Sequence, residues 1–297
     1  MPALALLPAL LAAALIPLSA RRPALRETWS LLASVAQAAL VFALLPGAAR
    51  GVVRETTLVE LAPGLPLLLR ADALGTVFAA LSSGLWILTT IYSIGYVRGL
   101  REHAQTRYFC AFALCLFAAL GVAFAGNLLT FFVFYELLTI STYPLVIHKE
   151  TPAAVRAGRM YLAYTLSAGV ALLVAVAWTA WLAGSVEFKP GGILDPALPP
   201  GTLWTLLALF ILGVGVKAAL MPLHSWLPVA MIAPTPVSAL LHAVAVVKAG
   251  VFGVVRMTGY VMGPDLLAEL GAGRALAWLA AATIIGASLL ALAQDNL

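Results

Sequence analysis

The sequence predicts an all-α membrane protein, a polytopic bundle of about nine transmembrane helices. Of its 297 residues, 63% are hydrophobic and only 10% are charged. The mean hydropathy of +1.04 lies far above the range of soluble domains. Apolar runs of roughly 18 to 25 residues recur along the chain, and each is long enough to cross the ~30 Å hydrocarbon core as a helix. Short clusters of basic residues separate many of these runs, as in other multispanning proteins.

The apolar runs give the expected spans in order. The first, "MPALALLPALLAAALIPLSA", has no basic residue ahead of it, so it is expected to be a retained helix rather than a removed signal. No Ser/Gly linker or charged tail marks a soluble domain, which predicts a single membrane domain over residues 1–297. The nine expected spans cover residues 3–19, 29–46, 73–95, 108–125, 127–147, 159–183, 202–221, 237–260 and 275–293.

Loop charges predict the orientation of the chain. Basic residues gather after the first, third and fifth spans, and this alternation predicts an N-terminus outside the membrane. The second loop is an exception, because its three arginines are offset by three acidic residues. The basic residues of the three loops are Arg21, Arg22, Arg26, Arg98, Arg101, Arg107, Lys149, Arg156 and Arg159. Since the net charge of +5 is explained by topology, no nucleic-acid partner is expected.

One carboxylate lies deep within an apolar run. Glu136 sits in the middle of "NLLTFFVFYELLTISTYPLVIH". An ionisable group at that depth costs at least a few kcal/mol, and such groups usually face a bundle interior or a hydrated path. Thr139 and Tyr143 share its helical face, and Pro144 is expected to bend the helix. These features favour a functional carboxylate over one that only locks two helices together.

A lysine ends another apolar run, beside several prolines. Lys217 closes "LWTLLALFILGVGVK", and Pro222 and Pro228 interrupt the helix soon afterwards. Discontinuous helices expose backbone polar groups, and membrane transporters place ion sites at such breaks. We therefore expect a discontinuous helix around Pro222, with the lysine inside the bilayer rather than snorkelling to its rim.

The next run contributes two further ionisable groups. His242 and Lys248 are six residues apart, which places them about 120° apart around a regular helix, so they need not touch. His224 is expected near an interface, and a structural histidine is the alternative there. His103 and His148 adjoin loop charges and are expected to be solvated.

These residues predict proton-relay chemistry. A glutamate with lysines and a histidine on separate helices can form a chain of protonatable groups near the bilayer centre. Moving Glu136 toward or away from Lys217 would change how tightly the lysine holds its proton. The sequence has no P-loop, Rossmann glycine pattern, cysteine ligand set or haem signature, so no cofactor, metal or reaction of its own is expected. Cys110 and Cys115 fall within one apolar run, as small hydrophobic residues.

Two stretches carry a resemblance to a known family. "KAALMPLHSWLPVAMIAPTPVSALLHAVAVVKAGVFG" and "FFVFYELLTISTYPLVIHKET" resemble motifs of the antiporter-like membrane subunits shared by Mrp-type sodium/proton antiporters and respiratory complex I. Within this family, the sequence that begins at Ala230 is most similar to that of the D-type Mrp subunit. The resemblance implies a relay of Glu136, Lys217, His242 and Lys248, partner membrane subunits, protons and Na⁺ as ions, and a location in the plasma (inner) membrane.

The resemblance also implies two inverted repeats of five helices, of which this sequence supplies the first. Residues 1–107 would form the N-terminal helices, residues 108–260 the first translocating repeat, and residues 261–297 the start of a second. The chain is therefore expected to be part of a longer subunit, and the alternative is a split gene. Val229 stands where some members, notably those of complex I, have an acidic residue.

The residues and the resemblance are compatible with three functions. The leading one is a proton-translocating subunit of a multisubunit cation/proton antiporter. The second is the equivalent pumping subunit of an NADH-quinone oxidoreductase or membrane-bound hydrogenase. The third is an assembly subunit whose charges only pair helices.

Overall fold

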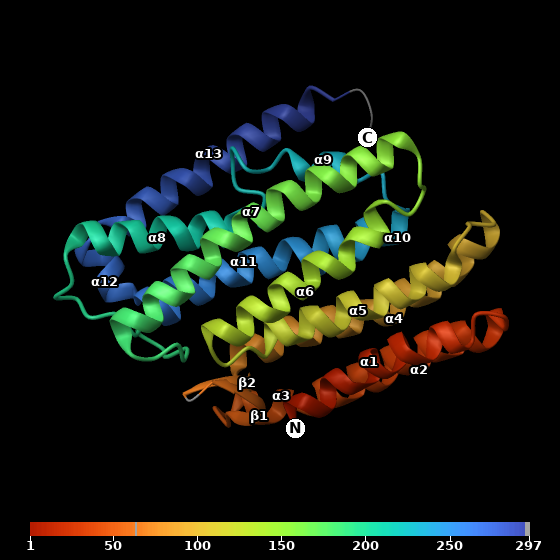
Figure 1. Cartoon of the computed structure of the whole chain (residues 1–297), viewed down its shortest axis with the longest axis horizontal. Helices are drawn as coiled ribbons and strands as arrows, with labels where there is room; N and C mark the ends of the chain where they lie inside the picture. The colour runs from red at the N-terminus through yellow and green to blue at the C-terminus, as the bar shows by residue number, and fades with distance from the viewer. Residues whose placement is uncertain (63, 295–297) are drawn as a thin grey trace.

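The structure, a computed structural model, describes residues 1–62 and 64–294. Long helices run side by side across the molecule, and most of their connections lie at its two ends (Figure 1). In order, the first half contains α1 (Pro2–Leu18), α2 (Pro23–Phe42), α3 (Leu45–Ala49), β1 (Arg54–Ala62), β2 (Leu65–Ala71), α4 (Ala73–Gly99), α5 (Gln105–Ala123) and α6 (Leu128–Val146).

The second half is more broken. It contains α7 (Pro152–Ala183), α8 (Pro200–Gly215), α9 (Trp226–Ala230), α10 (Thr235–Val237), a π-helix η1 (Ser238–Ala245), α11 (Val246–Arg256), a π-helix η2 (Met257–Met262), α12 (Pro264–Glu269) and α13 (Ala272–Leu292). Six helices in the described part are long and apolar enough to cross a membrane, and α1 and α8 are shorter apolar helices. The predicted span at 237–260 is divided between α10, η1, α11 and η2.

Local sequence explains where several helices begin. Asp72 caps α4 by accepting from the backbone N–H of Gly75 at 2.7 Å. Asn127 caps α6 in the same way, through Thr130 N at 2.7 Å. Such side chains satisfy backbone donors that have no partner within the helix. Proline opens α1, α2, α7 and α8, where its missing N–H costs nothing.

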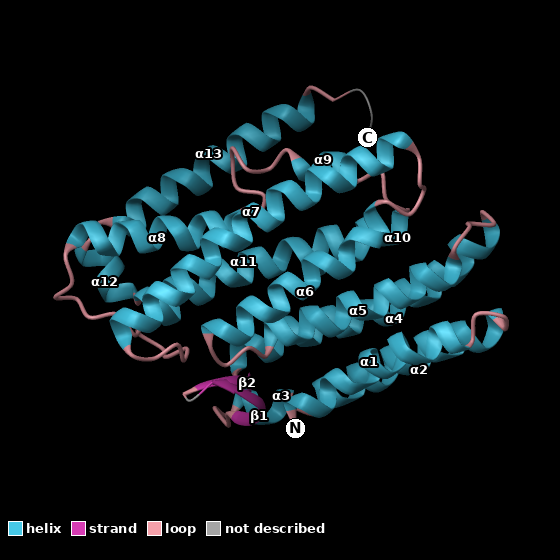
Figure 2. Ribbon diagram, in the orientation of Figure 1, coloured by secondary structure: helices cyan, strands magenta, loops and turns pink. Residues whose placement is uncertain are grey.

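A β-hairpin departs from the all-α prediction. Strands β1 and β2 pair antiparallel, with Arg54 opposite Ala71 and Thr57 opposite Leu68 (Figure 2). The hairpin is held against the first turn of α6, where Leu68 N donates to Thr130 Oγ1 at 2.8 Å. It lies beside the N-terminus, whose amine donates to Thr56 Oγ1 at 3.3 Å. Most charged residues of the predicted second loop therefore lie in this ordered hairpin.

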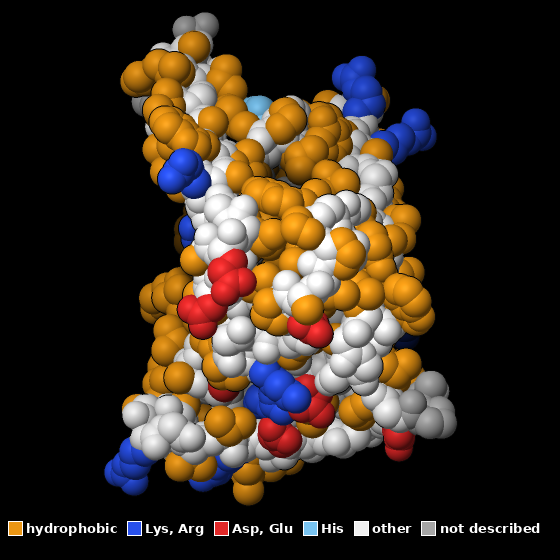
Figure 3. All heavy atoms as spheres, turned by 90° about the vertical axis from the view of Figure 1, so that its left-hand side faces the viewer, with side chains coloured by type: hydrophobic (Ala, Val, Ile, Leu, Met, Phe, Trp, Pro, Cys, Tyr) orange, Lys and Arg blue, Asp and Glu red, His pale blue; other side chains and the backbone are white. Residues whose placement is uncertain are grey.

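The hairpin end of the molecule has its own ion pairs. Arg70 on β2 contacts Glu55 at 2.6 Å and Glu187 at 3.2 Å. Figure 3 views this end and shows acidic and basic side chains gathered among largely apolar ones. The turns that hold most of the predicted basic loops lie at the opposite end of the bundle (Figure 1).

Candidate functional site

The helix that begins at Pro200 stops at Gly215, and the chain then runs irregularly to Trp226. Ala219 has a left-handed backbone (φ 55°), and the Met221–Pro222 peptide is cis. This confirms the predicted break around Pro222. Side chains satisfy carbonyl groups at the end of α8: the Tyr135 hydroxyl donates to Val214 O at 3.2 Å, and Trp226 Nε1 donates to Val216 O at 2.7 Å. The break is therefore stabilised by neighbouring helices.

Lys217 lies directly after α8 and is fully buried, with 1% of its surface exposed. Its ammonium donates a hydrogen bond to the backbone carbonyl of Tyr135 on α6. It also lies 3.4 Å from the centre of the Tyr135 ring, a cation–π arrangement. The C-terminal end of a helix favours a cation. Three features thus hold a positive charge at the break: a carbonyl, an aromatic face and a helix end.

Gly250 on α11 allows close contact with the backbone at Lys217. A methyl group at Gly250 would lie 2.6 Å from the Lys217 carbonyl carbon and 2.9 Å from Ala218 Cα. Real side chains do not approach backbone that closely, so only glycine permits this contact. Helix α11 therefore packs directly on the backbone at Lys217.

Glu136 follows Tyr135 on α6, next to the carbonyl that receives Lys217. Both of its carboxylate oxygens are inaccessible, and neither has a hydrogen-bond partner among the described residues. The carboxylate packs against Gly169 of α7, where a methyl group would lie 2.6 Å from Oε1. Lys217 binds the carbonyl of the residue before Glu136, and the two side chains make no ion pair in the described part of the chain. The two residues are adjacent but not bonded.

His242 lies in η1 and is 1% exposed. Its ring packs edge-on to Trp226, with centroids 6.4 Å apart, and neither ring nitrogen has a hydrogen-bond partner in the region described. π-helices frequently mark functional positions. Because Trp226 also binds Val216 O, it joins the surroundings of His242 to the break beside Lys217.

Lys248 takes a different position. It is exposed on α11, on the same stripe as exposed Val251 and Val255, whereas His242 is buried. The predicted separation of the two around the helix agrees with this. The structure therefore brings Glu136, Lys217 and His242 into one buried region and leaves Lys248 on its outer side.

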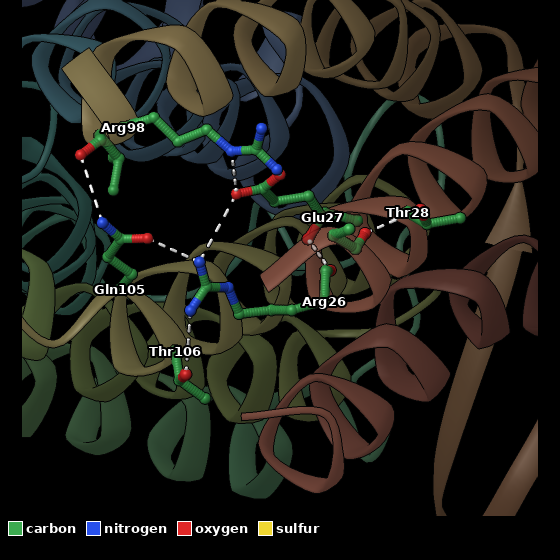
Figure 4. A network of polar contacts seen from close by, with 9 residues as sticks. Arg26, Glu27, Thr28, Arg98, Gln105 and Thr106 are labelled. Carbon is green, nitrogen blue, oxygen red and sulfur yellow. Dashed lines mark hydrogen bonds and ion pairs between the residues drawn. The ribbon is translucent and has the colours of Figure 1, made fainter. Parts of the chain in front are cut away.

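A buried ionic network lies at the end of the bundle where α4 and α5 meet. Arg26 and Glu27, both 4% exposed, lie on α2 (Figure 4). Glu27 accepts from Arg98, and Arg26 donates to Gln105 Oε1 at 2.6 Å. From the sequence, Arg26 and Arg98 were interpreted only as loop charges, because nothing in the pattern shows that they share one carboxylate.

A second cluster at the same end corrects another expectation. His148 was expected to be solvated, but its side chain is fully buried. Burial lowers the pKa of its imidazole to about 4, with further lowering by His103 and Arg107. The pKa of Glu150 is also lowered, because Arg107 donates a hydrogen bond to its carboxylate. The ring of His148 is covered by the turn between α4 and α5, which sequence spacing does not reveal.

More than half of the chain matches a known family of membrane proteins. Residues 125–297 match the model of the NADH:quinone oxidoreductase/Mrp antiporter transmembrane family. The chain is 36% identical over 204 residues to the A/B subunit of a probable K⁺/H⁺ antiporter of Rhizobium meliloti, covering 68% of this chain and 20% of that protein. It is 31% identical over 226 residues to the A1 subunit of a Na⁺/H⁺ antiporter of Staphylococcus aureus, covering 75% of this chain and 26% of that protein.

Solved structures are similar over most of the chain. The Mrp complex of Dietzia sp. DQ12-45-1b matches with a TM-score of 0.78 and 27% identity, covering 91% of this chain and 29% of that one. Respiratory complex I of Thermus thermophilus matches in fold, with a TM-score of 0.73 and 22% identity, covering 98% and 58%. The two antiporter relatives named above are A-type subunits, so they do not support the predicted D-type assignment. The chain spans about a quarter or less of their length.

Proposed function

Because the chain belongs to the NADH:quinone oxidoreductase/Mrp antiporter transmembrane family, we propose that it is a proton-translocating part of a multisubunit monovalent cation/proton antiporter. The observation that carries this proposal is the buried Lys217 at a helix break, next to the inaccessible carboxylate oxygens of Glu136. An ionisable group in that position is costly, and such groups usually mark ion or proton pathways. The 36% and 31% identities to antiporter subunits favour an antiporter over a redox pump.

The proposed step is a change of partner by the lysine. In the structure Lys217 binds the Tyr135 carbonyl, and the Glu136 carboxylate is the next residue on α6. Movement of the ammonium from the carbonyl toward the carboxylate would favour both charged forms, and movement away would release a proton. His242, beside Trp226, would receive the proton, and Lys248 on the outer side of α11 would pass it onward.

The wider assignments rest on the same family. We propose that residues 108–260, which contain all four relay residues, form the translocating repeat, preceded by residues 1–107 and followed by residues 261–297 as the start of a second repeat. The partners would be other membrane subunits, the ions protons and Na⁺, and the location the plasma membrane with the N-terminus outside. A redox pump is the competing function, and flavin or iron–sulfur absorbance in the purified complex would favour it.

The test is proton flux in sealed vesicles that contain the whole complex. We expect Glu136→Gln and Lys217→Ala to lower cation-driven proton flux at least tenfold, about 1.4 kcal/mol in barrier, with assembly intact. Glu60→Gln, on the exposed hairpin, is the matched control and should leave flux unchanged. Normal flux in assembled Glu136→Gln and Lys217→Ala complexes would exclude the relay. Loss of the assembled complex in both would instead favour the assembly function.

A further inference from the structure

Three metal-ligating side chains meet at the end of the bundle, away from the relay. Glu102 and His103 lie on the turn between α4 and α5, and His148 follows the end of α6. One ligand atom from each residue lies within 4.8 Å of the others. His148 Nε2 is 3.7 Å from Glu102 Oε2, and the two imidazole rings stack with centroids 5.0 Å apart. The residues come from two separate turns of the chain.

The buried member of the cluster has nitrogens without partners. The His148 side chain is 0% exposed, and neither of its ring nitrogens has a hydrogen-bond partner among the described residues. Buried polar atoms are normally hydrogen-bonded, so a buried imidazole with two unbonded nitrogens is unusual. The ring is held in place by other contacts: it packs edge-on to Tyr108 at 5.5 Å, and its main-chain carbonyl accepts from Arg107 at 3.2 Å. His148 Nε2 is therefore held in a fixed position facing Glu102.

The backbone around these residues is unusual. Arg101 and Ala104, which flank Glu102 and His103, have φ of 51° and 48°, and Glu150 has φ of 53°. Residues other than glycine pay a cost in this left-handed region, and such strain concentrates at ligand clamps and functional sites. Both turns that supply the ligands thus depart from ordinary backbone geometry.

The donor set identifies the kind of ligand. Two imidazoles and one carboxylate suit zinc and similar divalent transition metals, whereas Mg²⁺ and Ca²⁺ prefer oxygen. The Glu150 carboxylate lies 3.9 Å from His103 Nε2, but it is paired with Arg107. Glu102 therefore supplies the negative charge. Tetrahedral zinc requires ligand atoms roughly 3.3 Å apart, at Zn–N distances of about 2.0–2.1 Å. The His103 side chain is 47% exposed and can rotate inward to close the site.

We infer that Glu102, His103 and His148 form a binding site for a zinc-class divalent cation. The metal would join the turn between α4 and α5 to the end of α6. Three protein ligands leave a fourth position for water, as in open zinc sites. This site is independent of the proposed relay, because it shares no residue with it.

The test is zinc binding by the purified complex that contains this chain. Samples are stripped with chelator, equilibrated with buffered Zn²⁺, and assayed for bound metal. His148→Ala opens a cavity and risks misfolding, so the main variant is the half-exposed His103→Ala, with Glu102→Gln as the second. We expect each to bind about one Zn²⁺ fewer per chain, or to lower the affinity at least tenfold. His224→Ala, outside the cluster, is the control and should bind as the parent does.

A second readout uses Co²⁺ in place of Zn²⁺. We expect a visible absorption band of low-symmetry, four-coordinate cobalt in the parent complex and its loss in His103→Ala. Because the comparison is between variants of this chain, metal bound by other subunits cancels. Equal metal content and equal cobalt spectra in the parent, His103→Ala and Glu102→Gln complexes would overturn the inference, whatever the flux assay shows.

Discussion

At the scale of single residues, the buried carboxylate shows how closely this region is fitted. Glu136 has no bonded partner among the described residues, yet its position is limited by Gly169 on the neighbouring helix. Any side chain at Gly169 would meet the carboxylate rather than its hydrocarbon stem, since the two atoms nearest to the added carbon are Oε1 and Cδ at 2.6 and 2.8 Å. Glycine at this point therefore determines where the charge lies.

We expect Gly169→Ala to displace the Glu136 carboxylate and to lower proton flux several-fold, with the overpacking costing about 1–3 kcal/mol in stability. Flux in sealed vesicles and the thermal stability of the complex measure the two effects. Gly95→Ala on α4 is the matched control, because a methyl group there meets nothing within 4 Å. Flux equal to that of the parent in the Gly169→Ala complex would mean that the carboxylate tolerates movement.

The interior positions of the ionisable residues assigned to the proposed relay could mostly be predicted from the sequence, because an ionisable residue inside an apolar run is conspicuous. Glu136, Lys217 and His242 were found in this way, and all three are held in one interior region. The partner of Lys217 could not be found, because it is the main-chain carbonyl of Tyr135, and backbone groups leave no mark in a sequence. His148 was misjudged for a related reason, since its cover comes from a turn more than forty residues earlier in the chain.

At the scale of elements, the break after α8 depends on contacts from three helices. Tyr135 of α6 and Trp226 of α9 bind its carbonyl groups, and α11 presses against its backbone through Gly250. The prolines predicted that a break exists, but not what holds it. The hairpin at 54–71 was missed because its sequence shows mixed charges rather than a clear alternation of polar and apolar residues.

We expect Gly250→Ala to push α11 away from the break and to move Lys217 from the Tyr135 carbonyl. The clash involves backbone atoms that cannot rotate aside, so the loss of stability should reach about 1–3 kcal/mol. Hydrogen exchange of the backbone at 216–220 and proton flux should both change. Gly259→Ala in η2 is the control, with open space around the added methyl group. Unchanged exchange at 216–220 would show that the break does not depend on this contact.

At the scale of the whole molecule, buried ion pairs join helices that are distant in sequence. Arg26 and Glu27 connect α2 to α4 and α5 at one end (Figure 4). At the other end, Arg256 of α11 is 1% exposed and donates to Asp72 at the start of α4 at 2.8 Å. These pairs fix the ends of the bundle, where apolar packing alone specifies helix position weakly.

We expect Glu27→Gln to destabilise the complex strongly, by about 3–5 kcal/mol, because it leaves the charge of Arg26 buried without its carboxylate. Thermal unfolding in detergent measures the loss. The exposed Glu60 on β1 offers a control of the same chemistry, and Glu60→Gln should change stability by less than about 0.5 kcal/mol. A melting temperature in Glu27→Gln equal to that of the control would show that Gln105 and Thr106 alone can hold Arg26.

Helix α13 is connected to the irregular segment that follows α8. Much of the surface of α13 is exposed, and Trp278 is 72% exposed. Yet Thr283 accepts a hydrogen bond from Met221 N at 3.1 Å, four residues beyond Lys217. Any force that slides α13 along its axis must either break that bond or pull on the irregular backbone next to the lysine. The position of α13 and the position of the buried charge are therefore linked through one main-chain amide.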